Sequence, residues 1–275
     1  MEYFTTAGGI TVHLYDSEDK PENVAGKKTV VLLHGYLETI YIWQQFIEKL
    51  QDRYRFIVMD LPGHGLTDSA PADEKGKIIN SMEFCADTVK AVMDKINVSE
   101  AFIAGHSMGG YIALVCIHKY PELFRKLALM NITPYSDFED KKNDVEREVS
   151  IIRTGKLETL ACLSIPGMYC KDNLRKFDDK IRETIELCEM HFPEGIIGFI
   201  YGMHSRKDIS SYLENTSIPV ISICGDSDPF ISVSTFDEMK KRFRNVEFHL
   251  LKNTGHNSFI EAEDETVDKL CEFFG

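Results

Sequence analysis

The sequence lacks the features of a secreted or membrane-spanning protein. Its seven cysteines are odd in number and form no C-x-x-C pair, and most of them lie in apolar runs. That pattern is typical of free thiols in a reducing compartment. No apolar run approaches the roughly eighteen residues of a spanning helix, and the N-terminal MEYFTTAGGI has neither the basic nor the apolar region of a signal peptide. These absences predict a cytoplasmic protein that does not enter the membrane.

The chain also has fewer basic than acidic residues. The chain has 31 Lys and Arg against 44 Asp and Glu, a formal net charge of −13. Nucleic acids and anionic membranes bind basic patches, so we expect neither as a partner. The His, Cys and Asp residues show no metal-ligand spacing, and no glycine-rich dinucleotide or phosphate loop is present. We therefore expect no metal and no cofactor, and the sequence indicates no particular oligomeric state.

Short strands and helices alternate along the first half of the chain. Residues 3–16 alternate apolar and polar side chains around two glycines, which predicts an antiparallel hairpin. The runs 29–35 and 55–60 are nearly all apolar, as in strands buried on both faces of a sheet. Ser81 can cap a helix that follows. Strands and helices at such short intervals favour parallel pairing with helices on both faces, so the sequence predicts an α/β fold.

The alternation breaks between about residues 136 and 214, where charged helical segments occur without a convincing strand. Nine of the thirteen residues in 137–149 are acidic or basic, which suits a solvated outer face. A strand pattern resumes at residues 219–224. We therefore predict one core formed by 1–135 and 215–275, with 136–214 as a helical cap, or lid, inserted between two strands of the same sheet.

Residues 105–109, GHSMG, match the pattern G-x-S-x-G between an apolar strand and a helix. Glycines two positions before and after the serine leave room for a sharp turn, since side chains there would collide with a neighbouring strand or helix. Ser107 then projects alone, and the N-terminus of the helix favours developing negative charge. The alternative is a plain glycine-rich turn, but a strand before the motif and a helix after it favour a nucleophilic serine.

A serine hydroxyl needs a base, and the base needs a carboxylate that orients it. After a turn of this kind the acid is expected first and the histidine second. Of the nine histidines, His256 lies in a turn directly after a predicted strand. An earlier strand ends in GDSDP, where two aspartates compete. We favour Asp228, which Pro229 holds, because Asp226 follows the strand too closely and can serve as a turn or cap residue.

Acyl transfer also requires N–H donors for the negative charge that develops on a carbonyl oxygen. The backbone N–H of Met108, directly after the nucleophile, is one candidate for this oxyanion hole. The second candidate is the N–H of Tyr36, in the loop His34-Gly35-Tyr36 that follows an apolar strand. We expect Gly35 to let the chain turn there.

The motifs LLHGY, DLPGHGLTD, GHSMGGYIAL, GDSDPF and NTGHNSFIEAED together resemble the α/β-hydrolase superfamily over nearly the whole chain. Among its branches the sequence is similar to the capped esterases and their relatives, which include cofactor-free haloperoxidases and C–C bond hydrolases. The resemblance implies a mostly parallel, eight-stranded sheet and a serine nucleophile. The serine argues against the dehalogenase and epoxide hydrolase branches, which use aspartate there. The HGY loop resembles the branch whose oxyanion donor is the residue after HG.

The predicted function is hydrolysis of carboxylic esters or thioesters of a small molecule through an acyl-enzyme on Ser107. His256 is then the general base and acid, and Asp228 is the orienting acid. Two alternatives remain: a C–C bond hydrolase or menaquinone-pathway-like lyase with the same three residues, and a receptor-like ligand-binding protein with a vestigial triad. Aromatic and sulfur-containing side chains are the expected walls of the substrate pocket, namely Met168, Tyr169, Tyr201, Met203 and Phe230.

Overall fold

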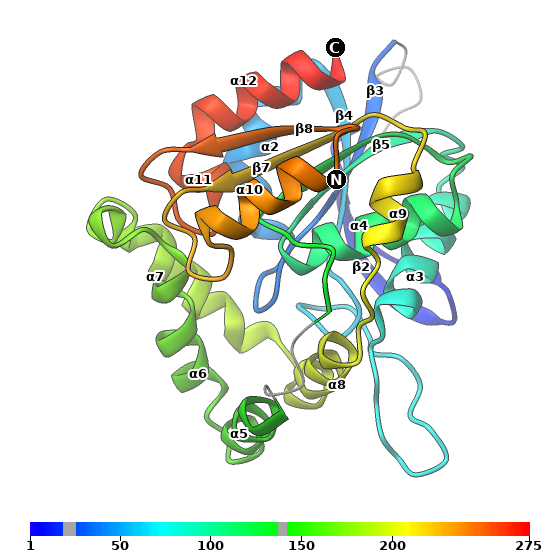
Figure 1. Ribbon diagram of the computed structural model, residues 1–275. Coiled ribbons are helices and arrows are strands. Elements are labelled where there is room, and N and C mark those ends of the chain that lie inside the picture. The colour runs from blue at the N-terminus through cyan, green and yellow to red at the C-terminus, as the bar shows by residue number, and fades with distance from the viewer. Residues whose placement is uncertain (19–25, 137–141) are drawn as a thin grey trace.

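The computed structural model describes residues 1–18, 26–136 and 142–275. Its centre is one eight-stranded sheet with the strand order β1-β2-β4-β3-β5-β6-β7-β8 (Figure 1). The pairs β1–β2 and β2–β4 are antiparallel, and every pair from β4 onward is parallel. The opening hairpin and the mostly parallel, eight-stranded sheet are therefore confirmed. The strands are β1 (Glu2–Ala7), β2 (Ile10–Asp16), β3 (Lys28–Leu33), β4 (Tyr54–Met59), β5 (Ala101–His106), β6 (Phe124–Met130), β7 (Val220–Gly225) and β8 (Val246–Leu251).

Helices cover both faces of the sheet, because its central strands are apolar on both sides. Val31 and Leu33 of β3 belong to a core cluster that includes side chains of α3 and α4. Val30 and Leu32 belong to the opposite cluster, which includes side chains of α2 and α12. All four valine and leucine side chains are fully buried. The helices that pack on the sheet, with the short turn η1 before α2, are η1 (Ile40–Trp43), α2 (Gln44–Leu50), α3 (Met82–Lys95), α4 (Met108–Lys119), α10 (Val233–Arg242), α11 (Ser258–Glu261) and α12 (Glu263–Phe274).

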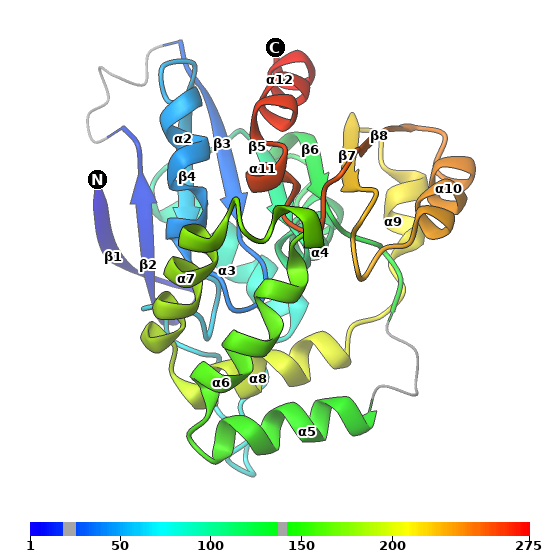
Figure 2. The same ribbon diagram turned by 90° about the vertical axis from the view of Figure 1, so that its left-hand side faces the viewer.

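Between β6 and β7 the described chain is helical, with no strand among residues 142–215. Helices α5 to α8 lie together at one end of the molecule (Figure 2). Residues 137–141, part of the predicted charged outer face, lie outside the described residues. The helices are α5 (Lys142–Arg153), α6 (Leu157–Ser164), η3 (Pro166–Met168), η4 (Lys171–Asn173), α7 (Asp178–Leu187), η5 (Cys188–Met190), α8 (Pro193–His204) and α9 (Ser210–Asn215).

A local sequence signal explains where helix α3 begins. Helix α3 begins after Ser81, whose side chain accepts a hydrogen bond from the Phe84 N–H, as expected for an N-cap.

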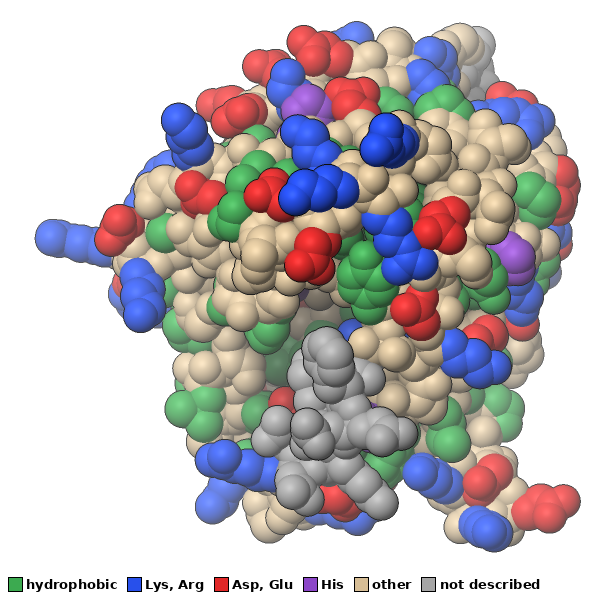
Figure 3. Space-filling model, in the orientation of Figure 1, with side chains coloured by type: hydrophobic (Ala, Val, Ile, Leu, Met, Phe, Trp, Pro, Cys, Tyr) green, Lys and Arg blue, Asp and Glu red, His purple; other side chains and the backbone are tan. Residues whose placement is uncertain are grey.

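Five of the seven cysteines are buried, whereas Cys162 is exposed and Cys271 half-buried. Within the described residues no helix is long and apolar enough to cross a bilayer. On the face drawn in Figure 3, Lys and Arg side chains are mixed with Asp and Glu side chains.

Candidate active site

Ser107 occupies a strained turn between β5 and α4. Its backbone has φ 52° and ψ −119°, a left-handed conformation that costs a non-glycine residue about 1–3 kcal/mol. The flanking glycines permit this turn. A Cβ atom on Gly105 would lie 2.4 Å from the carbonyl of Gly109, and one on Gly109 would lie 2.4 Å from the carbonyl oxygens of Leu33 and His34. Both positions therefore exclude any side chain, and the serine is presented between them.

Three of the candidate residues form one hydrogen-bonded line. The Ser107 Oγ lies 2.8 Å from His256 Nε2, and His256 Nδ1 lies 2.8 Å from Asp228 Oδ2. The three residues follow β5, β8 and β7, so the sheet brings together side chains that lie far apart in the sequence. Asp226 points elsewhere: it is exposed and accepts hydrogen bonds from the Ser227 hydroxyl and the Thr254 N–H. The structure thus brings Asp228 to His256, and not Asp226.

The surroundings of Asp228 favour its ionised form. Burial opposes the charge, but the charge of His256 and hydrogen bonds from His256, Asn131 and the Phe230 N–H together hold the pKa of Asp228 below its usual value. Its second oxygen, Oδ1, accepts from the N–H groups of Phe230 and Ile231 at 2.8 and 3.1 Å. Both carboxylate oxygens are therefore fixed, and the side chain cannot rotate away from His256 without losing several bonds.

Asn131 is a site residue that the sequence analysis missed. It follows β6 in a left-handed conformation, with φ 54°. Its Nδ2 donates to Asp228 Oδ2 at 2.9 Å and to the Gly255 carbonyl at 3.1 Å, and its Oδ1 accepts from the Ser258 N–H. The sequence contained a signal for this residue, namely an asparagine directly after a buried strand, at the same edge as Ser107 and Asp228. Asparagine tolerates a left-handed backbone better than most residues.

The loop after β3 contains a candidate N–H donor for a ligand, that of Tyr36. The Gly35 N–H donates to Glu38 Oε2, the Leu37 N–H to His64 Nε2, and the Glu38 N–H to the Gly35 carbonyl. Within the part of the chain that the structure describes, the Tyr36 N–H donates to no group. Met108 is the first residue of α4, so its N–H has no acceptor within the helix. Both N–H groups proposed for the oxyanion hole are thus available.

A buried ion pair lies behind this loop. His106 Nδ1 is 3.0 Å from Glu38 Oε2, and His106 Nε2 donates to the carbonyl of His256 at 2.9 Å. Burial opposes both charges, yet their mutual attraction lowers the pKa of Glu38 and raises the pKa of His106. The pair also corrects the role expected for Gly35. Gly35 has no left-handed backbone, and the reason for a glycine is that a Cβ atom would lie 2.8 Å from His106 Nδ1.

The residues expected to form pocket walls lie at different distances from the chemistry. The Phe230 ring packs edge-on against the His256 ring, with centroids 4.7 Å apart, and is 62% exposed. The Met168 carbonyl accepts a hydrogen bond from the His256 N–H at 2.6 Å, and the neighbouring Tyr169 is buried. The Tyr201 ring lies under the Lys77 ammonium. The structure thus places Phe230 and Met168 directly at His256.

Met203 lies on α8, like Tyr201, and packs against the core cluster that contains α3 and α4. A role for Tyr169, Tyr201 and Met203 as pocket walls stays a prediction.

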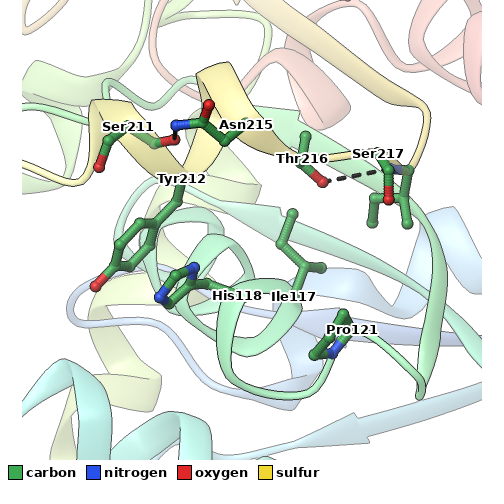
Figure 4. Close-up of a pocket in the computed structure, with 9 residues that line it drawn as sticks. Ile117, His118, Pro121, Ser211, Tyr212, Asn215, Thr216 and Ser217 are labelled. Atoms are coloured by element: carbon green, nitrogen blue, oxygen red, sulfur yellow. Dashed lines mark hydrogen bonds between the residues drawn. The ribbon is translucent and has the colours of Figure 1, made fainter.

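A cavity of about 250 Å³ lies at the other end of α4 (Figure 4). The His118 and Tyr212 rings stack there, with centroids 3.5 Å apart. Helix α4 rises 1.5 Å per residue, so this cavity lies roughly 15 Å from Ser107 at the helix N-terminus. It is therefore separate from the candidate active site. Its lining consists of Ile117, His118, Pro121, Ser211, Tyr212, Asn215, Thr216, Ser217 and Ile218.

Residues 28–149 match the family model for the alpha/beta hydrolase fold. The structure is similar over its full length to a thermophilic esterase from Thermogutta terrifontis, with a TM-score of 0.87, 22% identity and 98% of that chain covered. The matched segment includes β5, Ser107 and α4, so the family model covers the part of the fold that contains the candidate nucleophile. The chain therefore has the alpha/beta hydrolase fold.

Curated relatives of similar sequence differ in their named activities. An uncharacterised hydrolase of Bacillus subtilis, YugF, is 31% identical over 47% of this chain, and the alignment covers 44% of YugF. A 2-hydroxy-6-oxononadienedioate/2-hydroxy-6-oxononatrienedioate hydrolase of Paraburkholderia phymatum is 26% identical over 91% of this chain and 88% of its own length. A pimeloyl-[acyl-carrier protein] methyl ester esterase of Legionella pneumophila is 27% identical over 89% of this chain and 94% of its own.

Proposed function

We propose that the protein is a serine hydrolase that cleaves carboxylic ester or thioester bonds of small molecules. The observation that carries the proposal is the hydrogen-bonded line from Ser107 Oγ through His256 to Asp228, with 2.8 Å at each step. Two free N–H groups beside the serine, from Tyr36 and Met108, add the donors that acyl transfer needs. The pimeloyl-[acyl-carrier protein] methyl ester esterase aligns over 89% of this chain and 94% of its own length, which supports ester chemistry.

In the proposed reaction the Ser107 Oγ attacks the carbonyl carbon of the substrate while His256 Nε2 accepts the hydroxyl proton. Asp228 accepts the Nδ1–H of His256, which sets the tautomer and stabilises the imidazolium that forms. The N–H groups of Tyr36 and Met108 hold the negative oxygen of the tetrahedral intermediate. His256 then gives its proton to the departing alcohol or thiol, and a water molecule releases the acid by the same steps.

A fluorophosphonate probe and a p-nitrophenyl ester test the proposal together. We expect the probe to label Ser107, as located by mass spectrometry, and the ester to be turned over. Ser107→Ala should abolish labelling and lower kcat by about a millionfold, as in serine proteases. Ser211→Ala, an exposed serine on α9, is the matched control and should behave as wild type. A folded protein that is labelled elsewhere, or not at all, contradicts the proposal and favours a ligand-binding protein with a vestigial triad.

A second candidate is hydrolysis of a C–C bond in a vinylogous diketone, with the same three residues. It is supported by the 2-hydroxy-6-oxononadienedioate/2-hydroxy-6-oxononatrienedioate hydrolase of Paraburkholderia phymatum, whose alignment covers 91% of this chain. Side-by-side turnover of a p-nitrophenyl ester and a vinylogous 1,5-diketone separates the two candidates. A kcat/KM for the diketone that exceeds the value for every ester tested would replace the first proposal with the second.

We also propose that the helical insertion 136–214 is a lid that sets substrate choice. The Phe199 ring of α8 stacks on the Tyr36 ring, with centroids 6.5 Å apart, so the insertion lies against the loop proposed to bind the oxyanion. The Met168 carbonyl contacts the loop of His256. An insertion in contact with both loops is well placed to exclude water during acylation.

A further inference from the structure

Glu261 is a buried carboxylate that joins two segments far apart in the sequence. It ends the short helix α11 and is 7% exposed. Its Oε1 accepts the Gly255 N–H at 2.9 Å, directly before His256. Its Oε2 accepts the Cys170 N–H at 2.9 Å and the Asn173 Nδ2 at 2.8 Å. One side chain thus binds both the loop of His256 and the segment 168–173 of the insertion.

The two segments also contact each other directly. The His256 N–H donates to the Met168 carbonyl at 2.6 Å, and the Asn173 Nδ2 donates to the Asn253 carbonyl at 2.8 Å. Their backbones approach so closely that a Cβ atom on Gly255 would lie 2.5 Å from the Cys170 nitrogen and 2.6 Å from the Met168 oxygen. Glu261 lies beside this contact. Its two carboxylate oxygens accept hydrogen bonds from N–H groups of both segments.

The position of His256 depends on this contact. Its backbone N–H is bonded to the insertion through Met168, and its carbonyl accepts from His106, next to Ser107. A shift of segment 168–173 would therefore move the backbone that carries the imidazole. Displacements of about 1 Å at reacting atoms lower catalytic rates by roughly 100-fold.

We propose that Glu261 is a positioning residue that holds segment 168–173 of the insertion against the loop of His256. The position of this segment then sets the distance from His256 Nε2 to Ser107 Oγ. The proposal rests on the proposed function, in which these two atoms exchange a proton. Glu261 itself touches neither substrate nor reacting atoms. The insertion then has a second effect besides choosing substrates, because it keeps the general base in place.

A carboxylate suits this role better than an amide of the same size. Both oxygens of Glu261 receive N–H donors, and ionised carboxylates accept such bonds at each oxygen. Glu261→Gln keeps the size of the side chain but replaces one acceptor with an NH₂ group, which must face an N–H donor. One of the two segments is then released, with little change in volume.

The test compares Glu261→Gln with Glu265→Gln, an exposed glutamate on the following helix that loses the same charge. With p-nitrophenyl acetate we expect the kcat of Glu261→Gln to fall by roughly 10- to 100-fold. The KM should stay within about threefold of wild type and the thermal midpoint within a few degrees, whereas Glu265→Gln should match wild type throughout. A merely structural role predicts a lower thermal midpoint with unchanged kcat per folded molecule, and that result would overturn the proposal.

Asn173→Ala keeps the test decisive if Glu261→Gln fails to fold. It removes the bonds of Asn173 to Glu261 and to Asn253 but leaves the Gly255–Glu261 bond intact. We expect kcat to fall at least about fivefold, the effect of one lost hydrogen bond. Unchanged kcat in this variant contradicts the proposal. Wild type and Ser107→Ala are labelled with the fluorophosphonate in parallel. Absent labelling of the wild type refutes the proposed function, while normal labelling with unaffected variants refutes only the role of Glu261.

Discussion

Segment 168–173 and helix α5 both belong to the insertion, but they are held in different ways. Segment 168–173 is bonded to the loop of His256 through backbone and side-chain hydrogen bonds. Helix α5 packs against α8 and α6, with Val149 and Ile152 buried and Glu146 and Arg147 exposed. Hydrogen bonds are directional, whereas apolar contacts tolerate sliding. We therefore expect any lid motion to involve α5, while segment 168–173 stays with the loop of His256.

Among variants that keep Ser107, the largest effect should come from removing the carboxylate that orients His256. Asp228→Asn should leave the fold intact and lower kcat by up to about ten-thousandfold, because the orienting acid no longer sets the tautomer of His256. Asp226→Asn, the matched control, should cost far less because Asp226 does not contact His256. Steady-state kinetics on a p-nitrophenyl ester and circular dichroism check both. The reverse ranking would move the orienting role to Asp226.

Two replacements within the insertion test whether segment 168–173 and helix α5 differ in their effect on His256. Replacing the whole insertion 136–214 with a Gly/Ser linker removes Met168 as well as α5, so we expect kcat for small acetate esters to fall by roughly 100-fold. Replacing only residues 137–156 keeps segment 168–173, and small esters should be turned over at a rate close to wild type. Both variants should lose selectivity among long or bulky acyl esters. Equal kcat for acetate in the two variants would show that segment 168–173 does not support His256.

A smaller effect is expected from the ion pair on the opposite side of His256. Glu38→Gln leaves His106 buried without its charged partner and should lower the free energy of unfolding by about 3 kcal/mol. The depressed pKa of Glu38 contributes stability above its ordinary pKa of 4.5, and the raised pKa of His106 contributes stability below its ordinary pKa of 6.5. The loss should therefore be largest between about pH 4.5 and 6.5 and shrink as the pH rises through the folded-state pKa of His106.

Urea unfolding of wild type and Glu38→Gln at pH 5.5, 7.5 and 9 measures this difference. A destabilisation that is the same at pH 5.5 and 9 would mean that Glu38 and His106 do not form an ion pair.

The sequence was most informative where one local pattern determines a position. The strands, the turn at Ser107 and the order of acid and histidine follow from apolar runs and turn residues, so the fold, now confirmed, could be predicted. The same patterns selected Asp228 and His256, which the structure brings to Ser107, although their roles stay predictions. Local patterns carry no information about which loops meet above the sheet.

The contacts that support His256 could not be predicted for this reason. Glu38 meets His106 across 68 positions of sequence, Cys170 meets Glu261 across 91, and Asn131 meets Asp228 across 97. Each contact depends on the length and path of loops that start from different strands. Gly35 shows the same difficulty: the sequence favours a turn residue, while the actual constraint is the His106 ring from a neighbouring strand.

The place where the insertion enters the chain has an evolutionary consequence. Strands β6 and β7 are parallel neighbours, so some connection must run from the end of one to the start of the other. Lengthening a connection costs little conformational entropy, since each doubling adds only about 0.6 kcal/mol. With the insertion in its proposed role as a lid that sets substrate choice, related sequences can acquire new substrates by exchanging this connection without altering the sheet. The bonds of Glu261 limit that freedom, because a new connection must still offer N–H groups where Cys170 and Asn173 now offer theirs.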